Sequence, residues 1–311
     1  MHAEKSDLRY AVIIGDANMD ISATSSISMR TNGPHPCPAV IYKPGGGPRN
    51  IAESLALLGC KTYLISALGD DANGRDLAAV TQKAGVDLSA TRICEGQATG
   101  CYLIVNDCSG ENCCTVGNIA ITNLITPQWL ERYTELLHNA AAIVINTTLS
   151  RETLAWLLTH HGDQPIFVDT VGAHYCPRLD PWLARIHTLK PNRLEASKLS
   201  GLPLASRDQA PDVANWFHRA GVNQVVLSLG SYGFYYSNGM EAHWMDAPTV
   251  NVINVTGAGD ALLAGFVYGW LKELPWPEVA RFAKACAALT LMTDMNVHPE
   301  LSPRVAEELR M

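Results

Sequence analysis

Asn254-Val255-Thr256-Gly257-Ala258-Gly259-Asp260 is the stretch on which the interpretation of this chain rests, because its small residues lead into the apolar helical pattern of Ala261–Val267. Glycine lets backbone N–H groups turn toward an oxyanion, and the start of a helix adds the positive end of its dipole. The stretch therefore predicts a phosphate-binding cradle. Asp260 falls in the first helical turn, where it can accept a proton from an attacking hydroxyl. The alternative is that Asp260 only complements the helix dipole.

Composition excludes several other classes of protein. With 311 residues, of which 47% are hydrophobic, the chain can bury a sizeable core. The net charge of -7 and the lack of a Lys/Arg run argue against a nucleic acid polymer as partner. The polar start, Met1–Tyr10, and the lack of a long apolar run argue against secretion and a membrane span, so we expect a cytoplasmic protein.

The nine cysteines form no CxxC pair, and Cys113 and Cys114 are adjacent. Adjacent residues of a strand point to opposite faces, which suits neither a zinc site nor a disulfide between the two. We therefore expect reduced thiols, most of them buried.

Short apolar runs alternate with helical patterns along the chain. This alternation predicts a mostly parallel sheet with helices on both faces, in which ligands gather at the carboxyl ends of the strands. The expected strands are Tyr10–Gly15, Thr62–Leu68, Ala141–Asn146, Pro165–Asp169 and Asn223–Ser228. The expected helices are Asn50–Leu58, Gly74–Ala84, Pro127–Leu137, Arg151–Leu158, Leu194–Leu199 and Asp212–Ala220.

Two stretches, at about 22–44 and 97–120, interrupt this rhythm. The first is rich in Ser, Pro and Gly before a β-like Ala39–Tyr42. The second is typical of a hairpin in which Cys101–Asn106 turns at Ser109-Gly110 into Cys113–Val116. Together they predict a small β-layer, either a lid over the strand ends or an edge extension of the main sheet.

A second glycine cluster, Gly45-Gly46-Gly47-Pro48-Arg49-Asn50, precedes a predicted helix. Glycine permits close approach of the backbone to a ligand, and Asn50 offers both a donor and an acceptor, which suits a polyhydroxylated molecule. The alternative is a simple turn into a helix that starts with proline. No P-loop sequence is present, so the cradle at Gly257–Asp260 has to hold the phosphates.

Five motifs in this order resemble the ribokinase (PfkB) carbohydrate kinase family: Gly15–Asp20, Gly45–Asn50, Lys190–Ala196, Ser228–Gly233 and Asn254–Asp260. The resemblance covers nearly the whole chain. It implies a single kinase domain over residues 1–311, with a ribokinase-like three-layer α/β fold and a small β-sheet lid. It also implies transfer of a phosphoryl group from ATP to a small molecule.

The resemblance assigns roles to individual residues. Asp260 would be the general base, and the amides of Gly257, Ala258 and Gly259 would form the anion hole. Sugar hydroxyls would be held by a further set of residues: Asn18, Asp20, Gly46, Gly47 and Asn50. Alignment and charge neutralisation dominate phosphoryl transfer, so a carboxylate is an adequate base.

On the ATP side, Asn192 and Glu195 are three residues apart at the start of a predicted helix. By themselves they resemble a capping box. The family resemblance implies instead that they organise water around Mg²⁺ and the triphosphate, with Lys190 near the phosphates. It also places Ser228 and Gly230 near the phosphates, has Gly233 support the turn, and brings Ala283–Leu291 to the adenine.

Asn254 departs from the family pattern. Many members have an acidic residue there that helps to bind a monovalent cation such as K⁺, and a neutral amide oxygen is a weaker ligand. The stretch Met292–His298 also lacks the glycine-rich loop that usually completes that site. Both differences argue against potassium dependence, although members that phosphorylate pseudouridine share the Asn.

The phrases Leu189–Ala196 and Asn251–Asp260 are most similar to those members, so the resemblance implies the 5′-hydroxyl of pseudouridine as the acceptor. A base pocket would then lie under the lid. Its expected walls are Tyr42, Lys43, Thr99, Cys101 and Tyr102, and its expected contacts to the uracil edge are Thr99, Asn118 and Arg49. Alternation along the hairpin would send Thr99, Cys101 and Leu103 to one face and Gly100 and Tyr102 to the other.

Other functions remain open at this point. One is a kinase for another nucleoside or for a free sugar such as ribose or fructose. Another is a regulator that binds a sugar or nucleotide without catalysis, which Asp260 beside the phosphate cradle argues against. A β-lid with free edges also predicts a homodimer that pairs through the lid.

Overall fold

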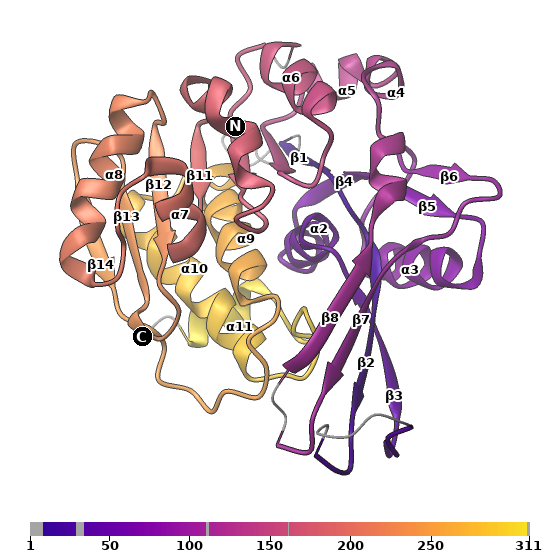
Figure 1. Ribbon diagram of the computed structural model, residues 1–311. Coiled ribbons are helices and arrows are strands. Elements are labelled where there is room, and N and C mark those ends of the chain that lie inside the picture. The colour runs from indigo at the N-terminus through magenta and orange to yellow at the C-terminus, as the bar shows by residue number, and fades with distance from the viewer. Residues whose placement is uncertain (1–8, 29–33, 110–111, 161, 310–311) are drawn as a thin grey trace.

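A large sheet runs through the centre of the computed structural model, which describes residues 9–28, 34–109, 112–160 and 162–309 (Figure 1). Its strands follow the order β14-β13-β12-β11-β10-β9-β1-β4. Pairing is parallel from β4 to β12, and β13 and β14 continue the edge antiparallel. The strands are β1 (Tyr10–Ile14), β4 (Lys61–Ile65), β9 (Ala142–Asn146), β10 (Ile166–Asp169), β11 (Thr188–Lys190), β12 (Gln224–Ser228), β13 (Phe234–Ser237) and β14 (Ala242–Met245).

Helices cover both faces of this sheet, which gives three layers. Ala11 and Ile13 of β1 pack in one apolar cluster with α2 and α9, while Val12 and Ile14 face a second cluster that contains α6, α7 and α8. Alternate side chains of a strand point to opposite faces, so both faces need an apolar cover. The first layer consists of α2 (Gly47–Leu57), α9 (Ala258–Leu271), α10 (Trp276–Leu291) and α11 (Pro303–Glu308). The second contains α6 (Arg151–His160), α7 (Arg193–Ser200) and α8 (Ala210–Arg219), with α4 (Pro127–Glu131) and α5 (Thr134–His138) beside them.

The predicted fold class is confirmed, but three local expectations are wrong. The run Thr62–Leu68 divides into β4 and β5 (Ala67–Gly69), and β5 pairs with β6 (Arg92–Cys94) in a separate two-stranded sheet. The expected helix Pro127–Leu137 divides into α4 and α5. Strands β11, β13 and β14 were not expected. The three residues of β11 are too few to show a periodic pattern.

A small second sheet lies beside the large one, in the order β3-β2-β7-β8 (Figure 1). Its strands are β2 (Asn18–Thr24), β3 (Val40–Gly45), β7 (Gly100–Asn106) and β8 (Asn112–Asn118), and α3 (Ala72–Lys83) packs under it. The expected hairpin is present as β7 and β8. The first stretch begins earlier than expected, since β2 starts at Asn18. Gly110 of the expected turn lies outside the described residues.

Register separates the two faces of the small sheet. Asp20 pairs with Lys43 and Tyr102, so these three side chains share a face. Met19 pairs with Cys101 and is buried on the other face, against α3. The polar face is therefore the one that carries Asp20.

None of the nine cysteines, all of which the structure describes, forms a disulfide, as expected from their spacing. The expectation that most are buried is wrong. Four are buried and Cys101 is half-buried, whereas Cys37, Cys108, Cys113 and Cys114 are exposed. The last three belong to the hairpin that contains β7 and β8 or to its turn, where the sheet has no cover.

Between residues 9 and 309, leaving out the undescribed gaps, no helix is long and apolar enough to cross a membrane.

Candidate active site

The glycine cradle forms the N-terminus of α9. Gly257 is the residue before the helix and adopts φ +85°, a left-handed conformation that favours glycine. A Cβ at this position would stand 2.0 Å from the carbonyl oxygen of Asn296, so the close approach also requires glycine. The first intrahelical hydrogen bond runs from Ala261 N–H to Gly257 O. Among the N–H groups before it, that of Ala258 makes a long hydrogen bond of 3.4 Å to Val255 O, whereas those of Gly259 and Asp260 precede the first intrahelical bond, as in the anion sites at helix N-termini.

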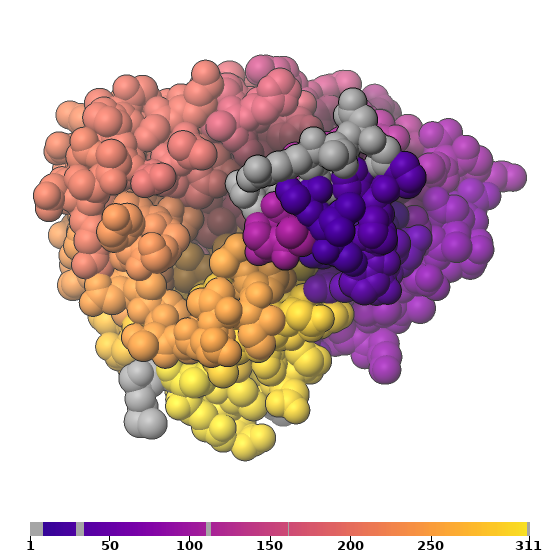
Figure 2. Space-filling model, turned by 60° about the horizontal axis from the view of Figure 1, so that its bottom comes forward, coloured from indigo at the N-terminus to yellow at the C-terminus, as the bar shows by residue number. Residues whose placement is uncertain are grey.

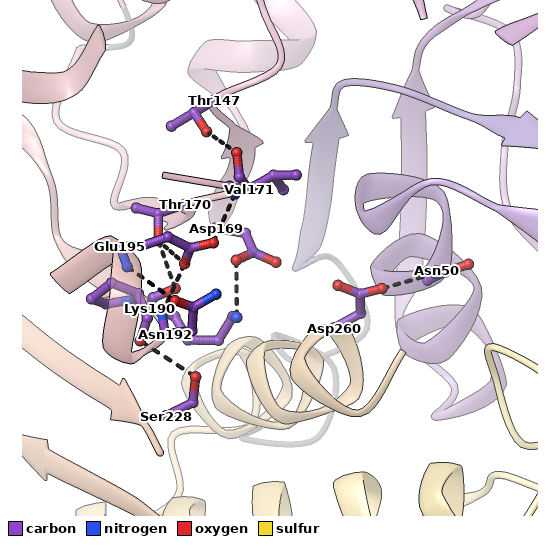
Figure 3. A network of polar contacts seen from close by, with 12 residues as sticks. Asn50, Thr147, Asp169, Thr170, Val171, Lys190, Asn192, Glu195, Ser228 and Asp260 are labelled. Atoms are coloured by element: carbon purple, nitrogen blue, oxygen red, sulfur yellow. Dashed lines mark hydrogen bonds and ion pairs between the residues drawn. The ribbon is translucent and has the colours of Figure 1, made fainter. Parts of the chain in front are cut away.

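Asp260 lies in the first turn of α9 and faces α2 (Figure 3). Its Oδ2 accepts a hydrogen bond of 2.8 Å from Asn50 Nδ2. Burial raises the pKa of Asp260 to about 7, and the charge of Asp169 adds to the increase, while Asn50 and Lys190 oppose it. A carboxylate with such a pKa can take up a proton near neutral pH.

Lys190 and Asp169 form a buried ion pair beside this carboxylate. Lys190 Nζ lies 2.9 Å from Asp169 Oδ1, at the carboxyl ends of neighbouring strands β11 and β10. A Cβ on Gly259 would stand 3.2 Å from the same Nζ, so the ammonium group reaches the cradle, where Lys190 was expected. Negative neighbours raise the pKa of Lys190, which keeps it charged beside an anion site.

The glycine cluster closes the opposite side of the site. Gly46 has φ +95° and lies against the backbone of Asp16. A Cβ on Gly47 would stand 3.3 Å from Asp260 Oδ1 and 4.0 Å from Asp169 Oδ2. A side chain at position 47 would therefore contact both carboxylates, and glycine leaves this position beside Asp260 free of a side chain.

Asn18 and Asp20 come together at the start of β2. Asn18 Nδ2 donates to Asp20 Oδ1 over 2.7 Å, and Asn296 Nδ2 donates to Asp20 Oδ2 over 2.8 Å. Burial raises the pKa of Asp20. Asn18 Oδ1 is buried, in a residue only 1% exposed, without a hydrogen-bond partner among the described residues. A buried acceptor of this kind needs a donor, and a sugar hydroxyl would supply one.

Asn296 was not predicted from the sequence. It donates to Asp20 and to the carbonyl of Pro44, and its own carbonyl packs against Gly257. Asn296 thus connects Asp20, which is expected to bind the sugar, to the glycine cradle at Gly257. Asn296 lies in an irregular segment after α10, so no periodic pattern marked it.

Arg49 is buried at the start of α2, beside Asn50. It is 2% exposed and donates to Asn50 Oδ1 over 2.9 Å and to Glu53 on the same helix. Because Asn50 Oδ1 faces Arg49, the Asn50 amide nitrogen is turned toward Asp260. Arg49 Nε and Nη1 have no partner among the described residues, so its contact with a substrate stays a prediction.

The expectations for Thr99 and Cys101 are contradicted. The Thr99 hydroxyl donates to Asp71 Oδ1 over 2.6 Å and accepts from Gly69 N–H over 2.9 Å, so both of its functions are occupied. Cys101 shares the face of Met19, which is turned away from Asp20. The alternation of side chains along the hairpin was expected. Thr99 and Cys101, however, were wrongly assigned to the substrate. Tyr102 lies on the face of Asp20.

A cavity of about 510 Å³ opens on the other side of the cradle. Figure 2 shows the surface hollowed between the small sheet and the C-terminal half of the chain. Four expected ATP-site residues line this cavity, with the α10 side chains predicted near the adenine: Asn192, Ser228, Gly230, Gly233, Lys284, Ala287 and Leu291. A Cβ on Gly233 would stand 2.0 Å from the carbonyl of Met245, so this turn requires glycine.

Asn192 and Glu195 form a capping box at the start of α7. Asn192 Oδ1 accepts from the N–H groups of Leu194 and Glu195, and Glu195 accepts from Asn192 N–H, Thr170 Oγ1 and Gly172 N–H (Figure 3). This was the simpler of the two interpretations of the pair. Within the described residues, no group of three or more His, Cys, Asp or Glu side chains is arranged to hold a metal ion. Water-mediated contact of Glu195 with Mg²⁺ stays a prediction.

The side chain of Asn254 forms hydrogen bonds with nearby backbone groups. Its Oδ1 accepts from Thr256 N–H over 3.0 Å, and its Nδ2 donates to the carbonyl of Asp294 over 3.4 Å. The oxygen that would ligate a cation is therefore already an acceptor for the chain.

Comparison with known proteins identifies the family to which this chain belongs. Residues 8–294 match the pfkB family carbohydrate kinases, and the chain belongs to this family. It is 42% identical to the pseudouridine kinase of Escherichia coli (strain K12) over 294 residues, 94% of each chain. It is 34% identical to the sugar kinase YeiI of the same strain, over 94% of this chain and 81% of that protein.

The fold agrees with solved structures. Ribokinase of Arabidopsis thaliana complexed with ribose and ATP has a TM-score of 0.87 at 24% identity, over 97% of this chain and 98% of that one. This likeness shows the ribokinase-like fold. Together with the family match, it makes the chain an ATP-dependent sugar or nucleoside kinase.

Proposed function

We propose that the protein phosphorylates the 5′-hydroxyl of pseudouridine with ATP and releases pseudouridine 5′-phosphate and ADP. The identity of 42% with the E. coli pseudouridine kinase supports this substrate. The observation that carries the chemistry is the position of Asp260. Its carboxylate follows Gly259, which lines the cavity beside the cradle, accepts a hydrogen bond from Asn50 of the glycine cluster, and has a pKa raised to about 7.

Asp260 removes the proton of the hydroxyl as its oxygen attacks the γ-phosphorus. The bond from that phosphorus to the bridging oxygen breaks, and ADP leaves with the electron pair. Amides at Gly257, Ala258 and Gly259 donate to the phosphoryl oxygens, and Lys190 adds positive charge beside Gly259. Little covalent chemistry is needed beyond this alignment.

Mg²⁺ would arrive with ATP and neutralise charge on the phosphates. Such ions are held mainly by phosphates, water and one or two carboxylates, so the lack of a dedicated cluster among the described residues fits this role. Asn192 and Glu195 would contact it through water. We expect activity without added potassium, because Asn254 Oδ1 already accepts a hydrogen bond from Thr256.

Asn18, Asp20, Gly46, Gly47 and Asn50 would hold the ribose. The orphaned Asn18 Oδ1 accepts from a sugar hydroxyl, and the glycine backbone permits close approach. Asp20 accepts from hydroxyl groups while Asn296 holds its carboxylate in place.

The test is ADP formation by the purified protein with pseudouridine, uridine, adenosine, ribose and fructose. The highest kcat/KM is expected for pseudouridine. A higher value for another nucleoside or for a free sugar would move the assignment to that substrate. Absence of turnover with all five would favour a regulator that binds without catalysis.

We further propose that the enzyme works in the cytoplasm as a homodimer that pairs through the small sheet. Tyr42, Leu103 and Val116 are exposed, and register places them in one row across the strands with Ile21. This apolar row lies on the face opposite Asp20. Leu103→Lys should convert a dimer to a monomer in analytical ultracentrifugation, and a monomeric wild-type protein would contradict the proposal.

A further inference from the structure

Asp16 is a buried carboxylate that the proposed mechanism does not use. It follows the carboxyl end of β1 and is 6% exposed. Asn146 Nδ2 donates to its Oδ1 over 2.6 Å, and Thr148 Oγ1 lies 2.8 Å from the same oxygen. Both neighbours thus hold Oδ1, and neither contact involves Oδ2.

The Thr148 hydroxyl lies close to two acceptors of this group. Thr148 Oγ1 also lies 2.7 Å from Asn146 Oδ1, but a hydroxyl group has one hydrogen. Thr148 can donate to Asp16 or to Asn146, not to both at once. In either case Asn146 Nδ2 donates to Asp16 Oδ1, and Oδ2 takes no part in these contacts, so this oxygen can accept from a ligand that brings an N–H or O–H.

Asp16 lies close to the residues that are expected to hold the sugar. Its charge, with those of Tyr175 and Asp20, adds to the burial that raises the pKa of Tyr102 to about 12, so these groups lie within electrostatic range of one another. Asp16 also acts on the pKa values of Asp20 and Asp260. A Cβ on Gly46 would stand 2.6 Å from the Asp16 carbonyl oxygen, so Asp16 also adjoins the glycine cluster that is expected to contact the sugar.

Two tyrosine side chains, Tyr102 and Tyr175, lie within electrostatic range of each other in the same region. A Cβ on Gly117 would stand 2.2 Å from the Tyr102 ring, so the ring lies directly over the β8 backbone and is held there. The Arg178 guanidinium lies 4.7 Å from the centre of the Tyr175 ring. The same Arg178 donates to the carbonyls of Thr147, Thr148 and Leu149, which ties Tyr175 to the segment that carries Thr148. Aromatic faces and a carboxylate suit a planar heterocycle with a ring N–H.

We infer that Asp16, oriented by Asn146 and Thr148, accepts a hydrogen bond from the N1–H of the uracil ring of pseudouridine and so selects this nucleoside over uridine. The inference rests on the proposed function. In pseudouridine the ring is attached through carbon, which leaves N1 with a hydrogen, whereas in uridine N1 carries the sugar. Asp16 would therefore recognise the one ring N–H donor that pseudouridine has and uridine lacks.

The experiment compares pseudouridine, N1-methylpseudouridine and uridine as substrates of the wild type, Asp16→Ala and Asp16→Asn. Loss of a hydrogen bond to a charged group corresponds to about 10- to 150-fold in kcat/KM. We expect a loss of that size for Asp16→Ala on pseudouridine only, with the preference for pseudouridine over N1-methylpseudouridine falling close to one. Asp16→Asn keeps an acceptor oxygen and should restore part of the preference.

Asp208→Ala, at an exposed carboxylate in η3 (Arg207–Gln209), is the matched control and should leave all three substrates unchanged. An equal loss on all three substrates in both Asp16 variants, or an unchanged preference, would overturn the inference. If Asp16→Ala does not fold, as judged by its melting temperature, Asp16→Asn carries the same comparison. A wild type that phosphorylates ribose or adenosine but not pseudouridine would refute the proposed function instead, before any variant is compared.

Discussion

Asp169→Asn is expected to move the acid limb of the pH profile of kcat/KM to lower pH. Asp260 has a pKa raised to about 7, and the negative charge of Asp169 is one cause. A neutral amide removes this repulsion, and Lys190, which loses its charged partner, then acts more strongly on Asp260. Both effects favour the ionised form of Asp260. Because only the ionised form accepts a proton, more of the enzyme is active below pH 7.

The size of the shift follows from the geometry around Gly47. Asp260 Oδ1 and Asp169 Oδ2 lie 3.3 and 4.0 Å from the position of a Gly47 Cβ, so the carboxylates face each other at short range. At about 7 Å, close to the largest separation that these two distances allow, and an effective dielectric constant of about 20, two unit charges interact by about 2 kcal/mol. This energy corresponds to a shift of about 1.5 pH units, and the ionised fraction at pH 6 would rise from about one tenth to about three quarters.

The assay is kcat/KM for the nucleoside, measured by ADP release across the acid limb, because this parameter reports groups of the free enzyme. Lys190→Met removes a charge that lowers the pKa of Asp260, so its limb should move to higher pH. Asp208→Asn, at an exposed site, should leave the limb in place. Limbs that stay at the wild-type pH in both active-site variants, or that move in the same direction, would refute the role of Asp260 as the titrating base.

Three further predictions concern the cradle and the sugar side. Asp260→Asn should lower kcat by about 10²- to 10⁴-fold while binding of an ATP analogue, measured by calorimetry, is retained; near-normal turnover would remove Asp260 from the base role. Gly257→Ala should abolish turnover and lower the melting temperature, because its Cβ would stand 2.0 Å from a carbonyl oxygen, whereas Gly59→Ala, with φ +76° and nothing within 4 Å, should lose stability only. Asn296→Ala should raise the nucleoside KM more than it lowers kcat, since it removes the donor that holds Asp20; a change in kcat alone would contradict this.

Much of the fold was predictable because local patterns reflect burial. The apolar runs at β1, β9 and β10 predicted central strands, and each is buried along almost its whole length. Patterns failed where an element is too short, as at β11, or where a turn interrupts a run, as at Ser66 between β4 and β5. The cradle was also predictable, since Gly257 and Asp260 are neighbours in sequence and their spacing sets the geometry of the helix start.

The sequence by itself determined the family motifs, the parallel α/β architecture and the residue types at the centre of the site. Only the tertiary structure decided which side chains meet. Asp16 and Asn146 are 130 residues apart, Asn50 and Asp260 are 210 apart, and Asp20 and Asn296 are 276 apart. Tertiary structure also decided that Tyr102, rather than Cys101, shares the face of Asp20. Alternation along a strand defines two faces, but only packing against α3 determines which of them is buried and which is left for a ligand.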